Sequence, residues 1–365
     1  MNNEMKKENI IDEYLVYMTE NGASDLHMST GEEPAVRIDG DVQRFGGEGE
    51  GKLEEEYLKE MIYEMMDEEQ IEYFERKGDY DFSYALEGVG RFRVNVFQQN
   101  RGIGTIMRLI PEKVLTMKEL GMEKMTFGED DKNIFRELAN SPRGLVLVTG
   151  PTGSGKSTTL AAMIDYINKN KKAHVLTVED PIEFVHTADQ AIFNQREVHR
   201  DTESFNDALR AALRQDPDAI LVGEMRDLET IKLAITAAET GHIVFGTLHT
   251  NSATKTIDRI IDVFPGDEKP MIRSMLSESL IGVVSQALLK KKGGGRVAAH
   301  EIMIATPAIK NLVREDKVAQ MYSMLQTGSK FGMQTLDQSL EDLVANDIVE
   351  KEEAYKKAFE KDRFK

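Results

Sequence analysis

The stretch GLVLVTGPTGSGKST, residues 144–158, decides the fold of the second half of the chain. Its first part, 144–149, is an apolar run that predicts a buried strand. Residues 150–157 then match the pattern G-x-x-x-x-G-K-[ST] without a mismatch. Glycines let such a loop bend until several backbone N–H groups converge on one anion, and the following helix adds its positive N-terminal end. A strand, a glycine loop and a helix in this order predict a nucleotide-binding site rather than a chance glycine turn.

We expect the whole loop to contact ATP, with two residues doing specific chemistry. Lys156 reaches the β- and γ-phosphates, and the hydroxyl of Ser157 ligates the Mg²⁺ that accompanies ATP. The predicted nucleotide-binding residues are Gly150, Pro151, Thr152, Gly153, Ser154, Gly155, Lys156, Ser157 and Thr158.

Three later apolar runs also end at polar side chains. AHVLTVED (173–180) and DAILVGE (218–224) end at carboxylates, and HIVFGTLHT (242–250) ends beside His249. Helix-like segments separate these runs, which predicts βαβ units and a mainly parallel sheet. Because ligands bind at the carboxyl ends of such strands, we expect these side chains to lie on the same edge as the glycine loop.

Glu224 is the candidate general base or water-orienting group. It follows Gly223, at a position where the usual pattern has a metal-organising Asp. The missing acid could come from the neighbouring strand end, 179–183. These acids could instead cap helix N-termini, an alternative that carries more weight for Glu179 and Asp180 than for Glu224.

Two histidines, His242 and His249, bracket one predicted strand. A lone histidine is usually structural, but two at the ends of one strand suggest sensing of the γ-phosphate or coupling to it. A shared metal ion is excluded, because a strand of seven residues would separate the two rings by ~23 Å.

Composition limits the remaining possibilities. The 365 residues predict two domains, and the absence of cysteine excludes disulfides and Cys-ligated metals. A net charge of −18 argues against broad binding to nucleic acid. The N-terminus lacks the apolar core of a signal peptide, and no apolar run approaches the ~18 residues of a membrane span. We therefore expect a cytoplasmic protein without a membrane-spanning segment.

The charge is unevenly distributed along the first half. Residues 1–80 carry 23 Asp/Glu against 8 Lys/Arg, yet no acidic residue occurs between Gly88 and Pro111. This window is either the solvated face of a strand pair or an anion-sensing edge. It holds four arginines, Arg91, Arg93, Arg101 and Arg108.

An arginine from this window could act on the nucleotide. P-loop ATPases often need a positive group from a neighbouring subunit to stabilise the transition state. Arg93 and Arg108 are the best candidates, followed by Arg101. This predicts a ring in which the first domain touches the nucleotide of its own or of the next subunit.

Periodicity predicts the remaining elements. Residues 9–20 and 53–77 have the spacing of amphipathic helices, and 80–110 that of strands. Near residue 283 a hairpin pattern begins, with glycines 293–295 at its turn, and helices run from there to the end. The expected organisation is an α/β domain over 1–112, a linker over 113–143 and a P-loop domain over 144–365.

Taken together, the motifs resemble the secretion-superfamily ATPases, and most closely the retraction ATPases of type IV pili that act in twitching motility. The resemblance spans nearly the whole chain. The segments that carry it are 22–42, 90–102, 150–163, 176–186, 194–201, 213–230, 237–253 and 307–316.

The resemblance implies a homohexameric ring with an N-terminal PAS-like domain and a C-terminal RecA-like domain. It implies docking on an inner-membrane pilus platform protein at the cytoplasmic face of the membrane, and ATP hydrolysis with Mg²⁺. It further implies that Glu224 is the catalytic glutamate and Glu183 the essential acid of an aspartate box. His242 and His249 would be the histidine-box residues, and Arg93 and Arg108 would contact nucleotide.

Four functions remain open at this point. The first is a motor that powers pilus retraction, and the second is an accessory paralogue that works beside such a motor. The third is a RecA-like nucleic-acid motor, against which the negative charge stands. The fourth is a ring that binds but does not hydrolyse ATP. The absence of cysteine argues against relatives that carry a tetracysteine zinc element.

Overall fold

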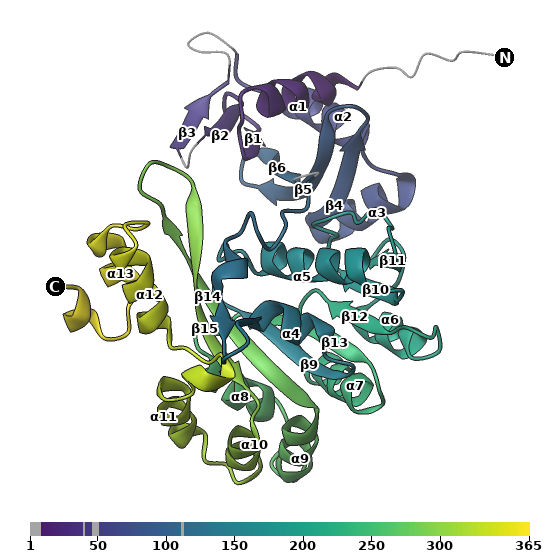
Figure 1. Cartoon of the computed structure of the whole chain (residues 1–365). Helices are drawn as coiled ribbons and strands as arrows, with labels where there is room; N and C mark the ends of the chain where they lie inside the picture. Colours follow the sequence, from purple (N-terminus) through teal and green to yellow (C-terminus); the bar gives the residue numbers. More distant parts are fainter. Residues whose placement is uncertain (1–8, 39–40, 46–50, 111–112) are drawn as a thin grey trace. The chain divides into compact units, whose positions relative to one another are not determined.

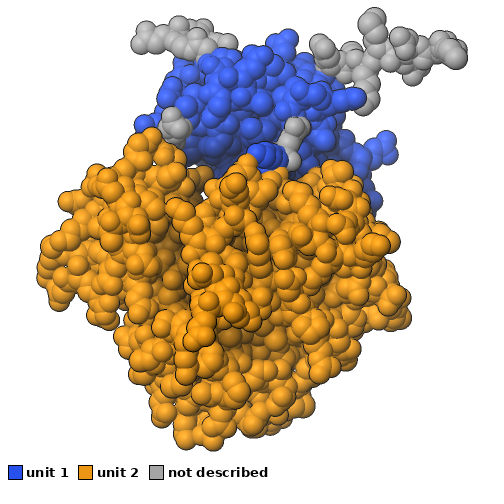
Figure 2. Space-filling view, viewed as in Figure 1, with its two compact units in different colours: residues 1–113 blue, residues 114–365 orange. Residues whose placement is uncertain are grey.

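The computed structural model describes residues 9–38, 41–45, 51–110 and 113–365. The chain divides into two compact units, 1–113 and 114–365. Figure 1 traces the elements along the chain, and Figure 2 colours the two units separately.

Unit 1 is built on an antiparallel sheet of order β3-β2-β1-β6-β5-β4. Alternate residues of β5 are buried, and its Phe92, Val94 and Val96 side chains are fully covered. Apolar side chains of the helices complete this core. The strands are β1 (Asp25–Ser29), β2 (Ala35–Ile38), β3 (Asp41–Arg44), β4 (Asp79–Leu86), β5 (Gly90–Gln99) and β6 (Gly102–Ile110); the helices are α1 (Ile10–Glu20), α2 (Glu55–Tyr63) and α3 (Glu68–Lys77).

The single long helix predicted over 53–77 is two helices. Asp67 interrupts it as the N-cap of α3, accepting a hydrogen bond from the backbone N–H of Gln70 at 2.9 Å. The Gln70 side chain in turn accepts from the Asp67 N–H at 3.0 Å. This reciprocal capping box satisfies two backbone donors and starts a new helix, although the apolar periodicity continues across the break.

Unit 2 contains a seven-stranded sheet of order β11-β10-β12-β13-β9-β14-β15. All its strand pairs are parallel except the β14–β15 hairpin. The strands are β9 (Gly144–Thr149), β10 (His174–Glu179), β11 (Ile192–Glu197), β12 (Ala219–Val222), β13 (Ile243–Leu248), β14 (Leu280–Lys290) and β15 (Arg296–Ile304), beside a small pair, β7 (Thr126–Phe127) and β8 (Lys132–Asn133).

Helices cover both faces of this sheet. On β9, Leu145 and Leu147 point into a core shared with helices α6 to α9, whereas Val146 and Val148 point into a core shared with α4 and α5. The helices concerned are α4 (Ile134–Asn140), α5 (Lys156–Asn170), α6 (Phe205–Ala212), α7 (Leu228–Glu239), α8 (Ala253–Asp262) and α9 (Lys269–Ser279). The structure confirms the predicted α/β class, with an N-terminal strand domain and a parallel-sheet core.

The C-terminal part follows the hairpin. Residues 293–295 turn it with positive φ angles, as glycine allows. A separate small core packs α12 and α13 against the β14–β15 hairpin. The helices of this part are α10 (Pro307–Arg314), α11 (Met321–Gln326), α12 (Leu336–Ala345) and α13 (Lys351–Lys357).

The stretch 113–143, expected as a linker, largely belongs to unit 2. It forms the β7–β8 pair and α4, and Met122, Phe135 and Leu138 lie in the core beneath α5. Its apolar residues are spaced among charges, so the sequence pattern does not reveal that they are buried. Within the described residues, no helix combines the length and the apolar character needed to cross a bilayer.

Candidate active site

The glycine loop lies between β9 and α5, as the motif requires. Gly150, Gly153 and Gly155 all have positive φ angles. A Cβ on Gly150 would come within 2.5 Å of both the Gln286 carbonyl oxygen and the Ser154 hydroxyl. Glycine is therefore required there, and the chain can turn tightly enough to bring its N–H groups together.

Lys156 begins α5 with its side chain directed back into the loop. Its ammonium donates to the carbonyl oxygens of Gly150, at 3.0 Å, and Pro151, at 3.3 Å. Burial lowers the pKa of Lys156, while the nearby charges of Glu224 and Glu183 oppose that shift. Ser157 and Thr158 share the first turn of α5, where backbone N–H groups lack helical partners and can bind an anion.

Glu224 follows β12, and its carboxylate contacts the side chains of Arg226 and His249. Its Oε1 lies 2.6 Å from Arg226 Nε and 3.2 Å from His249 Nε2, and its Oε2 accepts from the Arg226 guanidinium at 2.7 Å. Burial pushes the pKa of Glu224 up, but the hydrogen bonds and charges of Arg226 and His249 outweigh it and lower the pKa. The carboxylate is therefore ionised at neutral pH.

His249 connects this carboxylate to the phosphate loop. Its Nδ1 lies 3.5 Å from the Lys156 ammonium. Its other nitrogen, Nε2, lies 3.2 Å from Oε1 of Glu224. Lys156, His249 and Glu224 thus form a chain of polar contacts from the predicted phosphate position to the predicted base.

Glu179, the last residue of β10, lies beside the end of β12. Glu179 is buried, and this raises its pKa to about 7 even though Thr177 donates to it at 2.7 Å. A Cβ on Gly223 would lie 3.2 Å from the Glu179 Cα, so a side chain at 223 would crowd the neighbouring strand. The backbone N–H of Glu183 points to Glu179 at 3.4 Å, and the Glu183 charge acts on Lys156.

His242 lies at the opposite end of β13 from His249. Its Nδ1 is 2.9 Å from the carbonyl oxygen of Ala237, near the end of α7. The structure therefore brings His249, but not His242, to the phosphate loop of the same chain.

Arg93 and Arg108 lie in unit 1, directly opposite each other on β5 and β6. The Arg93 guanidinium forms an ion pair with Asp81 at 2.5 Å, and Arg108 donates to Asp25 at 2.7 Å. Both belong to one row across the sheet, formed by Arg37, Asp25, Arg108, Arg93 and Ser83. The side chain of Arg108 is 63% exposed although that of Asp25 is only 5% exposed, so this guanidinium can reach outward.

The oxygen-bearing side chains near the phosphate loop are of the kind that could bind a magnesium ion together with a nucleotide. Among the described residues, no three His, Asp or Glu side chains are grouped as a metal site. Mg²⁺ usually takes only one or two carboxylates, with substrate phosphates and waters as its other ligands. The Ser157 hydroxyl and the carboxylates near Lys156 supply ligands of that kind.

Comparisons with known proteins identify the family of the chain. The family described as "Type II/IV secretion system protein" matches residues 2–356. The chain belongs to this family. A relative within it, "Type IV pilus retractation ATPase PilT" of Pseudomonas aeruginosa, is 62% identical over 95% of this chain and 98% of its own length.

Two further members of the family help to place the chain. "Type IV pilus ATPase PilU" of the same organism is 38% identical over 92% of this chain and 85% of its own length. The crystal structure of "the Pilus Retraction Motor PilT and Bound ADP" superposes with a TM-score of 0.85 at 46% identity, covering 98% of this chain and 99% of that one. The chain is thus similar to the retraction motor over its whole length.

Sequence reasoning missed Arg226 as a site residue. Its position two residues after Glu224, at the end of a buried strand, was the available signal. The pairing itself depends on the turn after β12, which points both side chains to the same place.

Proposed function

We propose that this chain is an ATPase motor that hydrolyses ATP to power type IV pilus retraction, and so twitching motility. The observation that carries the proposal is the contact chain from Lys156 through His249 to Glu224, in a chain so similar to a retraction ATPase. The identity to the retraction ATPase, 62%, exceeds that to the paralogous pilus ATPase, 38%, which favours the main motor over an accessory role.

Each residue has a definite task in this proposal. Loop N–H groups and Lys156 bind the phosphates, and Ser157 offers its hydroxyl to the magnesium that accompanies ATP. When bound, this ion neutralises part of the phosphate charge. Glu224, ionised because Arg226 and His249 lower its pKa, orients the attacking water and accepts its proton.

His249 and Glu183 support this chemistry. His249 contacts the Glu224 carboxylate through Nε2 and the Lys156 ammonium through Nδ1, so a displacement of Lys156 on phosphate binding would be transmitted to Glu224. Glu183 adds a negative charge near the ammonium. His242, at the far end of β13, lies apart from this chain of contacts.

The motor is proposed to work as a homohexamer on an inner-membrane platform protein, at the cytoplasmic face of the membrane. Arg93 and Arg108 would supply positive charge to the transition state from unit 1, of the same or the next subunit. To do so they must exchange Asp81 and Asp25 for phosphate oxygens. A paralogous retraction ATPase is a further candidate partner.

Retraction in cells that lack their own retraction motor tests the proposal. Complementation with the unmodified chain should restore retraction, complementation with Glu224→Gln should not, and both proteins should accumulate equally. Glu239→Gln is the matched control, because Glu239 is an exposed glutamate at the end of α7. If the unmodified chain is expressed but does not restore retraction, the chain is an accessory or belongs to another secretion branch.

A further inference from the structure

The segment that carries Glu183 has no regular structure of its own. Residues 182–188, all of them described, lie in no helix or strand. Within this segment Ile182, Phe184 and His186 are buried, whereas Glu183 between them is only partly covered. A buried backbone group that lacks a hydrogen-bond partner is costly, so other parts of the chain must bind this backbone.

Two side chains of the neighbouring strand β11 bind it. Glu197, only 3% exposed, accepts from the backbone N–H of Ile182 at 3.1 Å. Gln195 accepts from the backbone N–H of His186 at 2.8 Å and donates to the carbonyl oxygen of Phe184, also at 2.8 Å. Because the two side chains are two residues apart on a strand, they point to the same face of β11. They therefore bind one backbone group before the glutamate of the segment and two after it.

β11 is itself fixed to the sheet of the candidate active site. It pairs in parallel with β10, with Gln195 opposite Thr177 and Glu197 opposite Glu179. Beyond the strand, the backbone N–H of Val198 donates to the carbonyl oxygen of Glu179 at 2.8 Å. On its other side β10 pairs with β12, the strand that precedes the candidate base. Figure 1 shows β11 beside β10 in this sheet, so the two side chains have a firm base from which to act.

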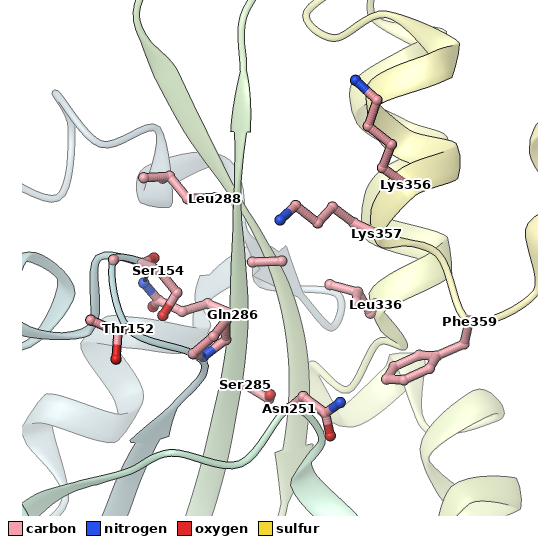
Figure 3. Close-up of a pocket in the computed structure, with 13 residues that line it drawn as sticks. Thr152, Ser154, Asn251, Ser285, Gln286, Leu288, Leu336, Lys356, Lys357 and Phe359 are labelled. Carbon is pink, nitrogen blue, oxygen red and sulfur yellow. Dashed lines mark hydrogen bonds between the residues drawn. The ribbon is translucent and has the colours of Figure 1, made fainter. Parts of the chain in front are cut away.

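A glutamine of another strand holds the phosphate loop in a similar way. Gln286 of β14 is only 3% exposed, and its amide donates to the carbonyl oxygen of Ser154 at 2.6 Å. Figure 3 draws both residues where β14 passes the loop. The phosphate loop and the segment 182–186 are thus each bound through their backbone by a glutamine that a strand supplies.

The position of Glu183 affects the phosphate loop. Its negative charge opposes the lowering of the Lys156 pKa that burial causes. Lys156 in turn lies 3.5 Å from His249. Because the interaction between two charges weakens with distance, displacement of the segment 182–186 would change the electrostatics at the ammonium that is proposed to bind phosphate.

We propose that Gln195 and Glu197 are positioning residues, which keep the Glu183 carboxylate beside the phosphate loop by binding the backbone on both sides of it. Neither side chain touches the nucleotide in this proposal, and both act through Glu183. The inference deepens the proposed function and rests on it, because Glu183 has this task only if ATP is hydrolysed at the loop. It also gives a task to two residues of 194–201, a segment that the proposed function does not otherwise use.

Single-turnover ATP hydrolysis by the full chain, with the protein in excess of ATP, tests Gln195. Gln195→Leu removes both hydrogen bonds but keeps the size of the side chain, so the rate should fall about tenfold while ADP affinity stays within about twofold. Asn194→Ala is the matched control, because Asn194 lies on the opposite face of β11 and its amide oxygen contacts His174 Nε2 at 2.7 Å. Its rate should equal that of the unmodified chain.

A conservative and a non-conservative change test Glu197. Glu197→Gln keeps an oxygen that can accept from the backbone N–H of Ile182, whereas Glu197→Leu does not. Glu197→Gln should therefore hydrolyse ATP at least about threefold faster than Glu197→Leu. Equal rates for the two variants would show that the hydrogen bond to Ile182 does not position Glu183.

A double-mutant cycle with Glu183→Gln separates positioning from a merely structural role. If Gln195 acts through Glu183, Gln195→Leu should lower the rate of Glu183→Gln by less than about twofold. An equal fall in both backgrounds, or no fall in the unmodified chain, would overturn the proposal. If Glu183→Gln hydrolyses ATP like the unmodified chain, the proposal fails while the roles of Lys156 and Glu224 stand. If the unmodified chain does not hydrolyse ATP, the proposed function fails and this inference with it.

Hydrogen exchange tests the contacts without relying on activity. In Gln195→Leu the backbone N–H of His186 loses its acceptor, so a peptide covering 182–188 should exchange faster than in the unmodified chain and in Asn194→Ala. Peptides from 205–212, in α6, should exchange as before, which would show that the variant is folded. Unchanged exchange over 182–188 would overturn the proposal.

Discussion

The phosphate-loop site of unit 2 and the arginines of unit 1 differ in the contacts that their charged side chains make. In unit 2, Lys156 and Glu224 are joined through His249 into one contact chain. In unit 1, Arg93 and Arg108 are each neutralised by a carboxylate of their own sheet. The side chains of the first site already contact one another, whereas in the proposed function the arginines must exchange a partner before they can act. This difference predicts which substitutions affect binding and which affect turnover alone.

The largest effect is expected at the phosphate loop. Lys156→Ala removes the ammonium that lies among the loop carbonyls, so both ATP binding and hydrolysis should fall, with turnover lowered about 1000-fold. Equilibrium binding and steady-state ATPase assays check this. Lys169→Ala on the exposed side of α5 is the control, since Lys169 forms an ion pair only with Asp165 among the described residues. If Lys156→Ala still bound ATP normally, Lys156 would not be the residue that binds the phosphates.

The arginines should affect turnover more than binding. Arg93→Ala and Arg108→Ala should each lower ATP turnover about 100-fold in the assembled protein, with little change in ADP affinity. Arg101→Ala is the matched control, because Arg101 is likewise paired with an acid of its own unit, Glu32, at 2.6 Å. Stability should hardly change for Arg93→Ala and Arg101→Ala, since partly exposed ion pairs contribute only about 0–1 kcal/mol. Arg108→Ala should destabilise more, because it removes a partner of the buried Asp25 carboxylate.

The three arginine variants can also give results that contradict the proposed role of Arg93 and Arg108. If all three arginine variants hydrolyse ATP at the same rate as the unmodified chain, the row is a structural feature of the sheet. A loss for Arg101→Ala alone would move the role to the third candidate.

Arg226 should set the pH range of hydrolysis. Because its hydrogen bond and charge lower the pKa of Glu224 against the effect of burial, Arg226→Gln should let that pKa rise. Glu224 would then become protonated at higher pH, so the acidic limb of the kcat/KM profile should move toward higher pH. Arg226→Lys, which keeps the charge, should move it less. If the acidic limb of the kcat/KM profile stays at the same pH in Arg226→Gln, ionisation of Glu224 does not determine that limb.

The smallest expected effect concerns stability. Burial raises the pKa of Glu179 to about 7 in the folded chain, above its ordinary value of 4.5. Between these two pH values the unfolded chain releases the proton and the folded chain retains it, so stability falls as pH rises through this window. Glu179→Gln should flatten this dependence, by about 1–3 kcal/mol across the window. Urea unfolding at several pH values measures it, and an unchanged slope would show that Glu179 is not the group responsible.

Much of the fold follows from local patterns. The strand–loop–helix around 144–158 and the apolar runs after it are sufficient to predict a parallel sheet with acids at one edge. The break at Asp67 was not predicted because a capping box interrupts the backbone without interrupting the apolar period. The packing of 113–143 in unit 2 was not predicted because burial there depends on distant partners on α5.

The site was predictable where a residue type is tied to a motif, and not elsewhere. The spacing identified Lys156 and Glu224 as candidates, but it could not tell that His249 joins them while His242 lies at the other end of the strand. That distinction depends on strand direction in the folded sheet. Arg226 carries no motif, and its contact with Glu224 follows from the turn after β12.

In the proposed function Glu224 acts in hydrolysis, at a site whose phosphate-binding residues are in place without it. The most direct measurement compares Glu224→Gln with the unmodified chain for both ATP affinity and ATP turnover under the same conditions. We expect an affinity within a few-fold of that of the unmodified chain and a turnover lower by at least about 100-fold. Turnover close to that of the unmodified chain would show that Glu224 does not act in hydrolysis.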